Sequence, residues 1–131
     1  MRLLAATKPD SPAISRALNF VKTHQHPDGG WGLTEDSDSL STALSLLGLA
    51  AVAKLGGGEE NNNLATPALS FLQSCQQPDK VWENCQLIRM EVGRATGQVY
   101  QILSYGSRTL TSTFVMKAAN AWHQLSRQTI L

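Results

Sequence analysis

The chain has 131 residues, of which 11 are basic and 10 are acidic, and its formal net charge is +1. This length favours a single domain, because a chain of this size buries roughly two thirds of the surface that it exposes when unfolded. The near balance of charge gives no electrostatic attraction for nucleic acid or for an anionic membrane, so we expect neither as a partner. Two cysteines, Cys75 and Cys85, form no CxxC pair, and we interpret them as ordinary thiols of a reduced, intracellular setting.

The start of the chain does not read as a secretion signal. Its apolar stretch runs only from Leu3 to Ala6 and is ended by the Lys-Pro-Asp sequence at 8–10, whereas a signal needs about 7–15 apolar residues. No apolar run approaches the roughly 20 residues that span a bilayer. We therefore expect a cytoplasmic protein without a transmembrane segment.

The first predicted helix follows Ser11 and Pro12, a favourable cap and a favourable first helical residue. Its apolar stripe at helical spacing consists of Ile14, Ala17, Leu18 and Val21. Pro27 is expected to end it. A second helix is predicted over about 39–55, where apolar residues surround most of the circumference and so need cover on several sides. We expect the amphipathic helix outside and the apolar helix inside, in a two-layer hairpin.

Three glycines at 56–58 are expected to end the second helix, and 59–63 are expected to form a polar loop. Thr66 and Pro67 would then open a third helix in the same way as the first one opens. Pro78 would end this third helix. It is therefore predicted to be the counterpart of the first helix, shorter by about one turn.

Two segments coincide when the sequence is shifted by 51 positions, as from Ala17 to Ala68. The identical pairs are Ala17 with Ala68, Leu18 with Leu69, Phe20 with Phe71, Gln25 with Gln76, Pro27 with Pro78, Asp28 with Asp79, and Trp31 with Trp82. Identity at one common spacing, the rare tryptophan included, is much less expected by chance than a shared apolar period. We therefore interpret the two segments as a duplication.

The second copy is followed by a different pattern. Residues 86–92 and 98–104 each alternate in polarity and are separated by 93–97, which begins and ends with glycine, and this predicts an inserted β-hairpin. Helical spacing of apolar residues resumes near Thr111 and continues to about Arg127. We interpret this last segment as the partner helix of the second repeat.

The first copy reads RALNFVKTHQHPDGGW from Arg16 to Trp31. It resembles the QW motif of squalene–hopene and oxidosqualene cyclases: a basic residue, an aromatic residue followed by an aliphatic one, glutamine, and then glycine, any residue and tryptophan. The second copy, FLQSCQQPDKVW, keeps the aromatic-aliphatic pair, the glutamine and the tryptophan. It departs from the motif at Lys80, which stands where the motif has glycine.

The resemblance implies an all-α fold, the α/α toroid that terpene cyclases share with protein prenyltransferases. We expect a partial toroid of two helical hairpins, about four helices, with the β-hairpin inserted near 86–104. The chain is expected to be one domain, 1–131, with a first repeat at 11–55 and a second repeat at 66–128.

The same resemblance implies that the repeated glutamines and tryptophans are structural. In the family the glutamine amide stacks on the indole ring and ties one outer helix to its neighbour, and an amide and an indole are suited to this at a helix end. The two glycines of the first copy fit a tight turn, since glycine adopts positive φ at little cost. The predicted structural motif consists of Gln25, Gly29, Gly30, Trp31, Gln76 and Trp82.

The cyclases of this family protonate their isoprenoid with a DxDD acid, which must stay protonated in an apolar cavity. The nearest segment here is Asp-Ser-Asp-Ser, with Asp36 and Asp38 just before the apolar helix. The last aspartate of the pattern is missing, and Ser41 would stand at the acid. Asp36 and Asp38 are the catalytic candidates, and charged caps of a helix are the alternative interpretation.

Prenyltransferases of the same toroid class bind zinc through aspartate, cysteine and histidine. The available residues here are His24, His26, His123, Cys75 and Cys85, and none stands in the family's Asp-x-Cys context. We therefore expect no metal site. No phosphate-binding or dinucleotide-binding glycine motif is present either, so no cofactor is expected.

A pocket mouth is a further possibility near the last helix, lined by Tyr105, Arg108, Phe114 and Trp122. In the alternative interpretation Arg108 is a solvated side chain, and Ser107 or Thr109 caps the helix.

Two functions follow from these patterns. The first is a terpene-cyclase-like or prenyltransferase-like toroid module with an isoprenoid-like apolar ligand, lacking the catalytic acid in this chain; if active, it would be an isoprenoid cyclase or a prenyltransferase. An aromatic content of 6% is low for a cavity that stabilises carbocations. The alternative is a non-catalytic module that covers its apolar inner face by self-association or by docking to a protein partner.

Overall fold

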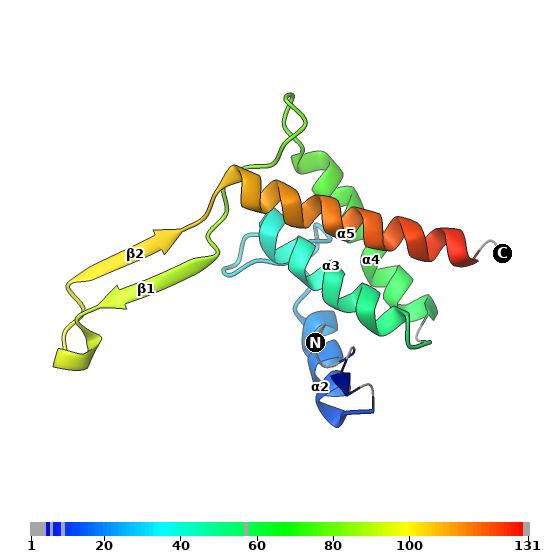
Figure 1. The fold of residues 1–131 in the computed structure, drawn as a ribbon, viewed down its shortest axis with the longest axis horizontal. Helices are drawn as coiled ribbons and strands as arrows, with labels where there is room; N and C mark the ends of the chain where they lie inside the picture. The colour runs from blue at the N-terminus through cyan, green and yellow to red at the C-terminus, as the bar shows by residue number, and fades with distance from the viewer. Residues whose placement is uncertain (1–4, 6, 9, 57, 130–131) are drawn as a thin grey trace.

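A computed structural model describes residues 5, 7–8, 10–56 and 58–129. Within them the helices are α2 (Pro12–Thr23), α3 (Ser39–Ala53), α4 (Gly58–Cys75) and α5 (Arg108–Thr129), and the strands are β1 (Ile88–Val92) and β2 (Gln101–Tyr105). A short 3-10 helix, η1 (Arg94–Thr96), joins the strands. Figure 1 shows a helical body from which the two-stranded hairpin projects. The prediction of a mostly helical partial toroid with an inserted hairpin is confirmed.

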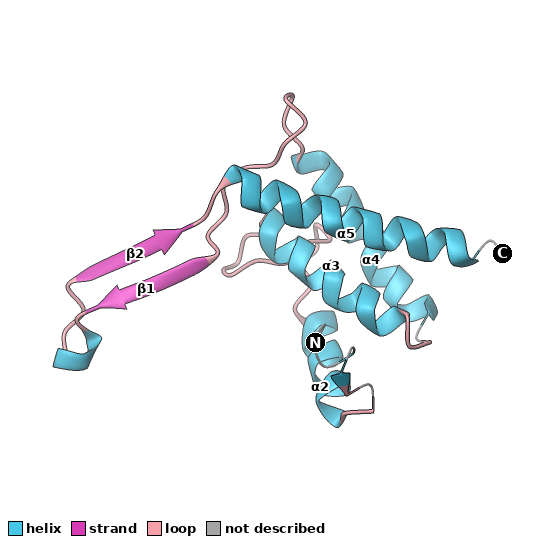
Figure 2. Cartoon of the chain, viewed as in Figure 1, coloured by secondary structure: helices cyan, strands magenta, loops and turns pink. Residues whose placement is uncertain are grey.

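Helix α3 is the centre of the helical body. It packs against α5 and α4 and makes a smaller contact with α2, an arrangement that can be followed in Figure 2. Its buried residues are Ser39, Leu40, Thr42, Ala43, Leu46, Leu47, Gly48, Leu49, Ala50 and Val52. Burial around most of the circumference is what its apolar sequence requires, and α3 is therefore the inner helix that the pattern predicted.

The first two helices begin where their caps place them. The Ser11 hydroxyl accepts a hydrogen bond from the Ala13 amide (3.3 Å), and Pro12 is the first residue of α2. The Asp38 carboxylate accepts a hydrogen bond from the Ser41 amide (2.7 Å) at the start of α3. Such caps satisfy amides that have no partner inside the helix. The predicted starts of both helices are confirmed.

The predicted start of the third helix is wrong. Helix α4 begins at Gly58, so residues 59–63 are helical instead of forming a loop, and Pro67 lies inside the helix. With 18 residues, α4 is longer than the 12-residue α2, not shorter. The buried face starts upstream of the proline, with Asn61 and Ala65 each 2% exposed. Packing of that face outweighs the hydrogen bond that a proline removes from a helix.

Helix α5 also starts earlier than predicted, at Arg108 instead of near Thr111. The Ser107 hydroxyl accepts a hydrogen bond from the Leu110 amide (3.0 Å) and so caps the helix. The buried residues of α5 form one stripe: Thr111, Val115, Ala118 and Trp122. A single stripe means that α5 is covered on one side, whereas α3 is covered on several.

The inserted hairpin pairs β1 with β2 antiparallel, with Ile88 opposite Tyr105 and Met90 opposite Leu103. Since side chains alternate between the two faces of a strand, these four residues share one face of the hairpin. All four are exposed, by 42% to 63%. The hairpin therefore carries an uncovered apolar face outside the helical body.

Candidate functional site

The repeated tryptophans occupy equivalent positions. The Trp31 indole N–H donates to the Val21 carbonyl (2.8 Å), and the Trp82 indole N–H donates to the Leu72 carbonyl (2.8 Å). In both copies the acceptor lies 10 residues before the tryptophan. The two rings are only 5% and 6% exposed. Each indole thus closes the turn back onto the outer helix that precedes it.

The two glutamines share a first hydrogen bond and differ in a second one. Gln25 Nε2 donates to the Gly29 carbonyl (2.9 Å), and Gln76 Nε2 donates to the Lys80 carbonyl (3.0 Å). Gln25 Nε2 also donates to the Leu64 carbonyl of α4 (2.9 Å). The first glutamine therefore ties its own turn to the next outer helix.

Gly29 and Lys80 are equivalent positions with positive φ, 93° and 71° respectively. At Gly29 the backbone of α4 comes very close, since a Cβ there would lie 2.6 Å from the Pro67 carbonyl carbon. That distance leaves room only for glycine. At Lys80 a Cβ is present and the side chain is exposed.

Two hydroxyl groups, that of buried Thr42 and that of half-buried Ser112, support the turns and were not among the predicted site residues. The Trp31 amide donates to Thr42 Oγ1 (3.0 Å), and the Trp82 amide donates to Ser112 Oγ (2.9 Å). Thr42 is completely buried on α3. A serine or threonine among the first five residues of each inner helix was the signal in the sequence. Each hydroxyl links the end of the repeat turn to the inner helix.

Two aspartates at equivalent turn positions carry lowered pKa values. The Ser37 hydroxyl donates to Asp28 (2.7 Å), as does the Gly30 amide (2.9 Å), and these bonds hold the pKa of Asp28 below its ordinary value. At Asp79 the hydrogen bond from the Arg108 guanidinium (2.8 Å) lowers the pKa. Hydrogen bonds to the charged form explain both shifts.

The two catalytic candidates line the same surface hollow. Asp36 and Asp38 line a volume of about 590 Å³ with Phe71, Cys75 and Cys85. Asp36 is exposed and Asp38 is half-buried. The two thiols are free and half-buried. The hollow thus lies between the segment before α3, the end of α4 and the segment after Trp82.

The carboxylate of Asp38 holds the start of α3 with both of its oxygens. Oδ1 accepts from the Ser41 amide and Oδ2 accepts from the Ser41 hydroxyl, each at 2.7 Å. Ser41, which would stand at the family's acid, is therefore a partner of this cap.

The four residues of the expected pocket mouth are not brought together. Trp122 is 5% exposed, and its indole N–H donates to the Leu46 carbonyl of α3 (2.9 Å). Arg108 lies at the start of α5, about 21 Å from Trp122 along a helix that rises 1.5 Å per residue. Phe114 packs against the helical core, and Tyr105 is 63% exposed on β2. Arg108 and Trp122 line separate hollows.

Residues 2–107 match the family model of the squalene-hopene cyclase C-terminal domain. The chain belongs to that family. Among its relatives, the squalene–hopene cyclase of Zymomonas mobilis is 34% identical over 93 residues, which cover 61% of this chain and 13% of that protein. The (+)-kolavenyl diphosphate synthase of Herpetosiphon aurantiacus is 38% identical over 48 residues, 37% of this chain and 9% of that protein. The chain thus spans a small part of the length of these cyclase-family relatives.

Membership of this family makes the chain a terpene-cyclase-like or prenyltransferase-like module. Within the described part of the chain, no group of three or more histidine, cysteine, aspartate or glutamate side chains is placed to hold a metal ion. No helix among the described residues is long and apolar enough to cross a bilayer.

Proposed function

We propose that the chain is a structural module of an isoprenoid-cyclase-type toroid. It supplies a helical wall for an apolar cavity, and further helical repeats complete that cavity around an isoprenoid-like ligand. The chain does not supply the acid that starts cyclisation.

The observation that carries this proposal is the position of Asp38. Asp38 is one of the two aspartates in the segment that most resembles the family's acid motif. Both of its carboxylate oxygens accept hydrogen bonds at the start of α3. The other, Asp36, is exposed beside a hollow that also contains polar side chains. A strong proton donor of a carbon–carbon double bond needs an apolar, water-excluding cavity, and the surroundings of these two residues do not supply one.

The test is to incubate the purified chain with squalene, oxidosqualene and geranylgeranyl diphosphate and to analyse the extracts for cyclised products. We expect none. Asp38→Asn is the control for the acid, because asparagine caps a helix about as well as aspartate. A product that the natural chain forms and the folded Asp38→Asn variant does not would overturn the proposal.

A second candidate is a non-catalytic interaction module, and the apolar face of the hairpin favours it. Strand β2 carries no charged residue from Gln101 to Tyr105, and an uncharged edge strand is suited to pairing with the same strand of a second copy. Light scattering should then show a dimer that Leu103→Lys dissociates. A natural chain that stays monomeric at high concentration would contradict this candidate.

A further inference from the structure

The two segments at the base of the inserted hairpin lie close together. A Cβ at Gly106 would lie 2.9 Å from the Cys85 carbonyl carbon, and the Ser104 hydroxyl donates to Gln86 Oε1 (2.7 Å). Figure 1 shows that the hairpin projects from the helical body. The packed base therefore directs an arm that stands clear of the helices.

Strand β1 has an open edge along this arm. Among the described residues the sheet has two strands, so β1 is paired with β2 on one side only. The backbone amides and carbonyls along an open edge can pair with a strand of another chain.

The two charged residues of β1 have opposite sign and share one face. Arg89 and Glu91 are two positions apart, so both side chains project from the face opposite to that of Ile88 and Met90. The Arg89 guanidinium donates to Glu91 Oε1 (2.5 Å). A strand that pairs with β1 must match this pair of charges, whereas β2 carries no charge.

An antiparallel second copy of β1 matches these charges in one register. When the two strands are centred on Met90, Arg89 of each copy lies directly opposite Glu91 of the other, and all five residues of each strand are paired. A two-fold axis makes the contact occur twice. Centring the pair on Arg89 or on Glu91 places like charges opposite each other, which is unfavourable. Charges on an edge strand usually prevent pairing, but here they select a single register.

We propose that β1 pairs with β1 of a second copy of the chain, antiparallel and centred on Met90. The two hairpins then form a four-stranded sheet with a continuous apolar face, since Ile88 of one copy lies opposite Val92 of the other. An isolated two-stranded hairpin is only marginally stable in water, and additional strands stabilise it. Because the strands run antiparallel, the two helical bodies lie at opposite ends of this sheet. The inference goes beyond the functions proposed above and uses the edge of the hairpin opposite to β2.

The contact is small. A strand of five residues is about 17 Å long, and its edge buries far less than the roughly 800 Å² per partner of a standard interface. We therefore expect a monomer–dimer equilibrium in which the dimer forms only at high protein concentration.

The test is sedimentation equilibrium of two charge variants, first alone and then mixed. Arg89→Glu leaves two acidic side chains on β1, and Glu91→Arg leaves two basic ones. Each variant alone places like charges opposite each other, so it should dimerise at least about tenfold more weakly than the natural chain. An equimolar mixture restores both contacts between opposite charges and should associate about as strongly as the natural chain.

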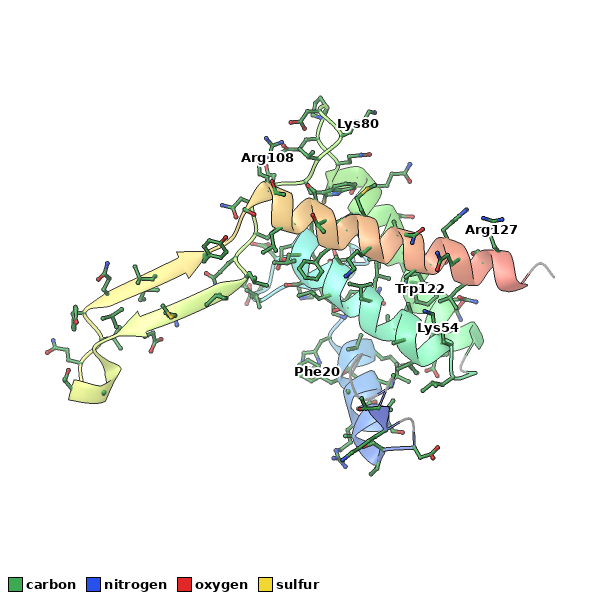
Figure 3. All side chains as sticks on the ribbon, in the orientation of Figure 1. Phe20, Lys54, Lys80, Arg108, Trp122 and Arg127 are labelled. Carbon is green, nitrogen blue, oxygen red and sulfur yellow. The ribbon has the colours of Figure 1, made fainter. Side chains whose placement is uncertain are left out.

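Two controls separate the register from general charge effects. The double variant Arg89→Glu/Glu91→Arg exchanges the two charges within one chain and should dimerise like the natural chain. Arg127→Glu mixed with Glu35→Arg changes the net charges by the same amounts at exposed residues outside the hairpin. Figure 3 shows Arg127 near the end of α5 that lies away from the hairpin. Mixing this second pair should not strengthen association.

Three results would overturn the proposal: a natural chain that stays monomeric at millimolar concentration, charge variants that dimerise like the natural chain, or a mixture of Arg89→Glu and Glu91→Arg that associates no better than each alone. Pairing through β2 instead would be insensitive to the charges of β1 and would be lost in Leu103→Lys. None of these results depends on catalysis, so they are separate from the outcome of the product analysis.

Discussion

Replacing Gly29 with alanine is expected to destabilise the chain by about 2–5 kcal/mol. The residue has φ of 93°, and its Cβ would lie 2.6 Å from the Pro67 carbonyl carbon of α4. A left-handed conformation costs a non-glycine residue about 1–2 kcal/mol. Overpacking against a neighbouring backbone costs about 1–3 kcal/mol more. Urea unfolding followed by circular dichroism measures the sum.

Gly56→Ala is the matched control for this prediction. Gly56 also has positive φ, 111°, but a Cβ there would meet nothing within 4 Å. Only the conformational cost of about 1–2 kcal/mol applies to it. Both alanines restrict the unfolded chain equally, so that contribution cancels in the comparison. Equal losses of stability in the two variants would refute the close packing of α4 on the first turn.

Three further outcomes are expected. Arg108→Gln should raise the pKa of Asp79 toward its ordinary value of 3.8, because it removes the guanidinium hydrogen bond. Carboxyl NMR titration measures this shift. In the natural chain the stability that the hydrogen bond adds should be lost as pH falls through the lowered pKa. Asp38→Ala should cost about 1 kcal/mol through loss of the α3 cap, whereas Asp36→Ala should change the free energy of unfolding by less than about 0.5 kcal/mol, since Asp36 is exposed; equal effects in urea unfolding would count against the cap. Trp82→Phe should cost about 1–3 kcal/mol, because it removes the hydrogen bond to the Leu72 carbonyl and part of a buried ring, and an unchanged urea midpoint would exclude that contact.

The sequence predicted the elements whose signals are local. The Ser11 and Asp38 caps determine where α2 and α3 begin. Apolar residues around most of the circumference of 39–55 predicted that α3 is the inner helix. The alternation of 86–92 and 98–104 predicted the hairpin, although the paired strands are shorter, Ile88–Val92 and Gln101–Tyr105. Each of these features depends on neighbouring residues and not on distant contacts.

The start of α4 could not be predicted in this way. Pro67 is a strong local signal for the first turn of a helix, yet nine residues before it are helical. Two of these residues, Asn61 and Ala65, are buried because α4 packs against α3. A tertiary contact therefore decides the boundary, and it overrides the local preference.

The candidate site was predictable in part. The duplication located both turns, but it could not show that Gln25 reaches the Leu64 carbonyl, since these residues are 39 positions apart. The expected grouping of Arg108 with Trp122 ignored their separation along α5. The sequence showed that Lys80 departs from the motif. Only the structure shows why glycine is needed at the equivalent Gly29, where the backbone of Pro67 lies close.

The central claim is that one structural unit is built twice, with each tryptophan closing its turn on the preceding outer helix. The most direct measurement is hydrogen exchange of the indole N–H groups of Trp31 and Trp82 by NMR. Both donate at 2.8 Å to backbone carbonyls from buried rings, so both should exchange only through cooperative unfolding and at similar rates. A Trp82 indole that exchanges orders of magnitude faster than that of Trp31 would contradict the claim.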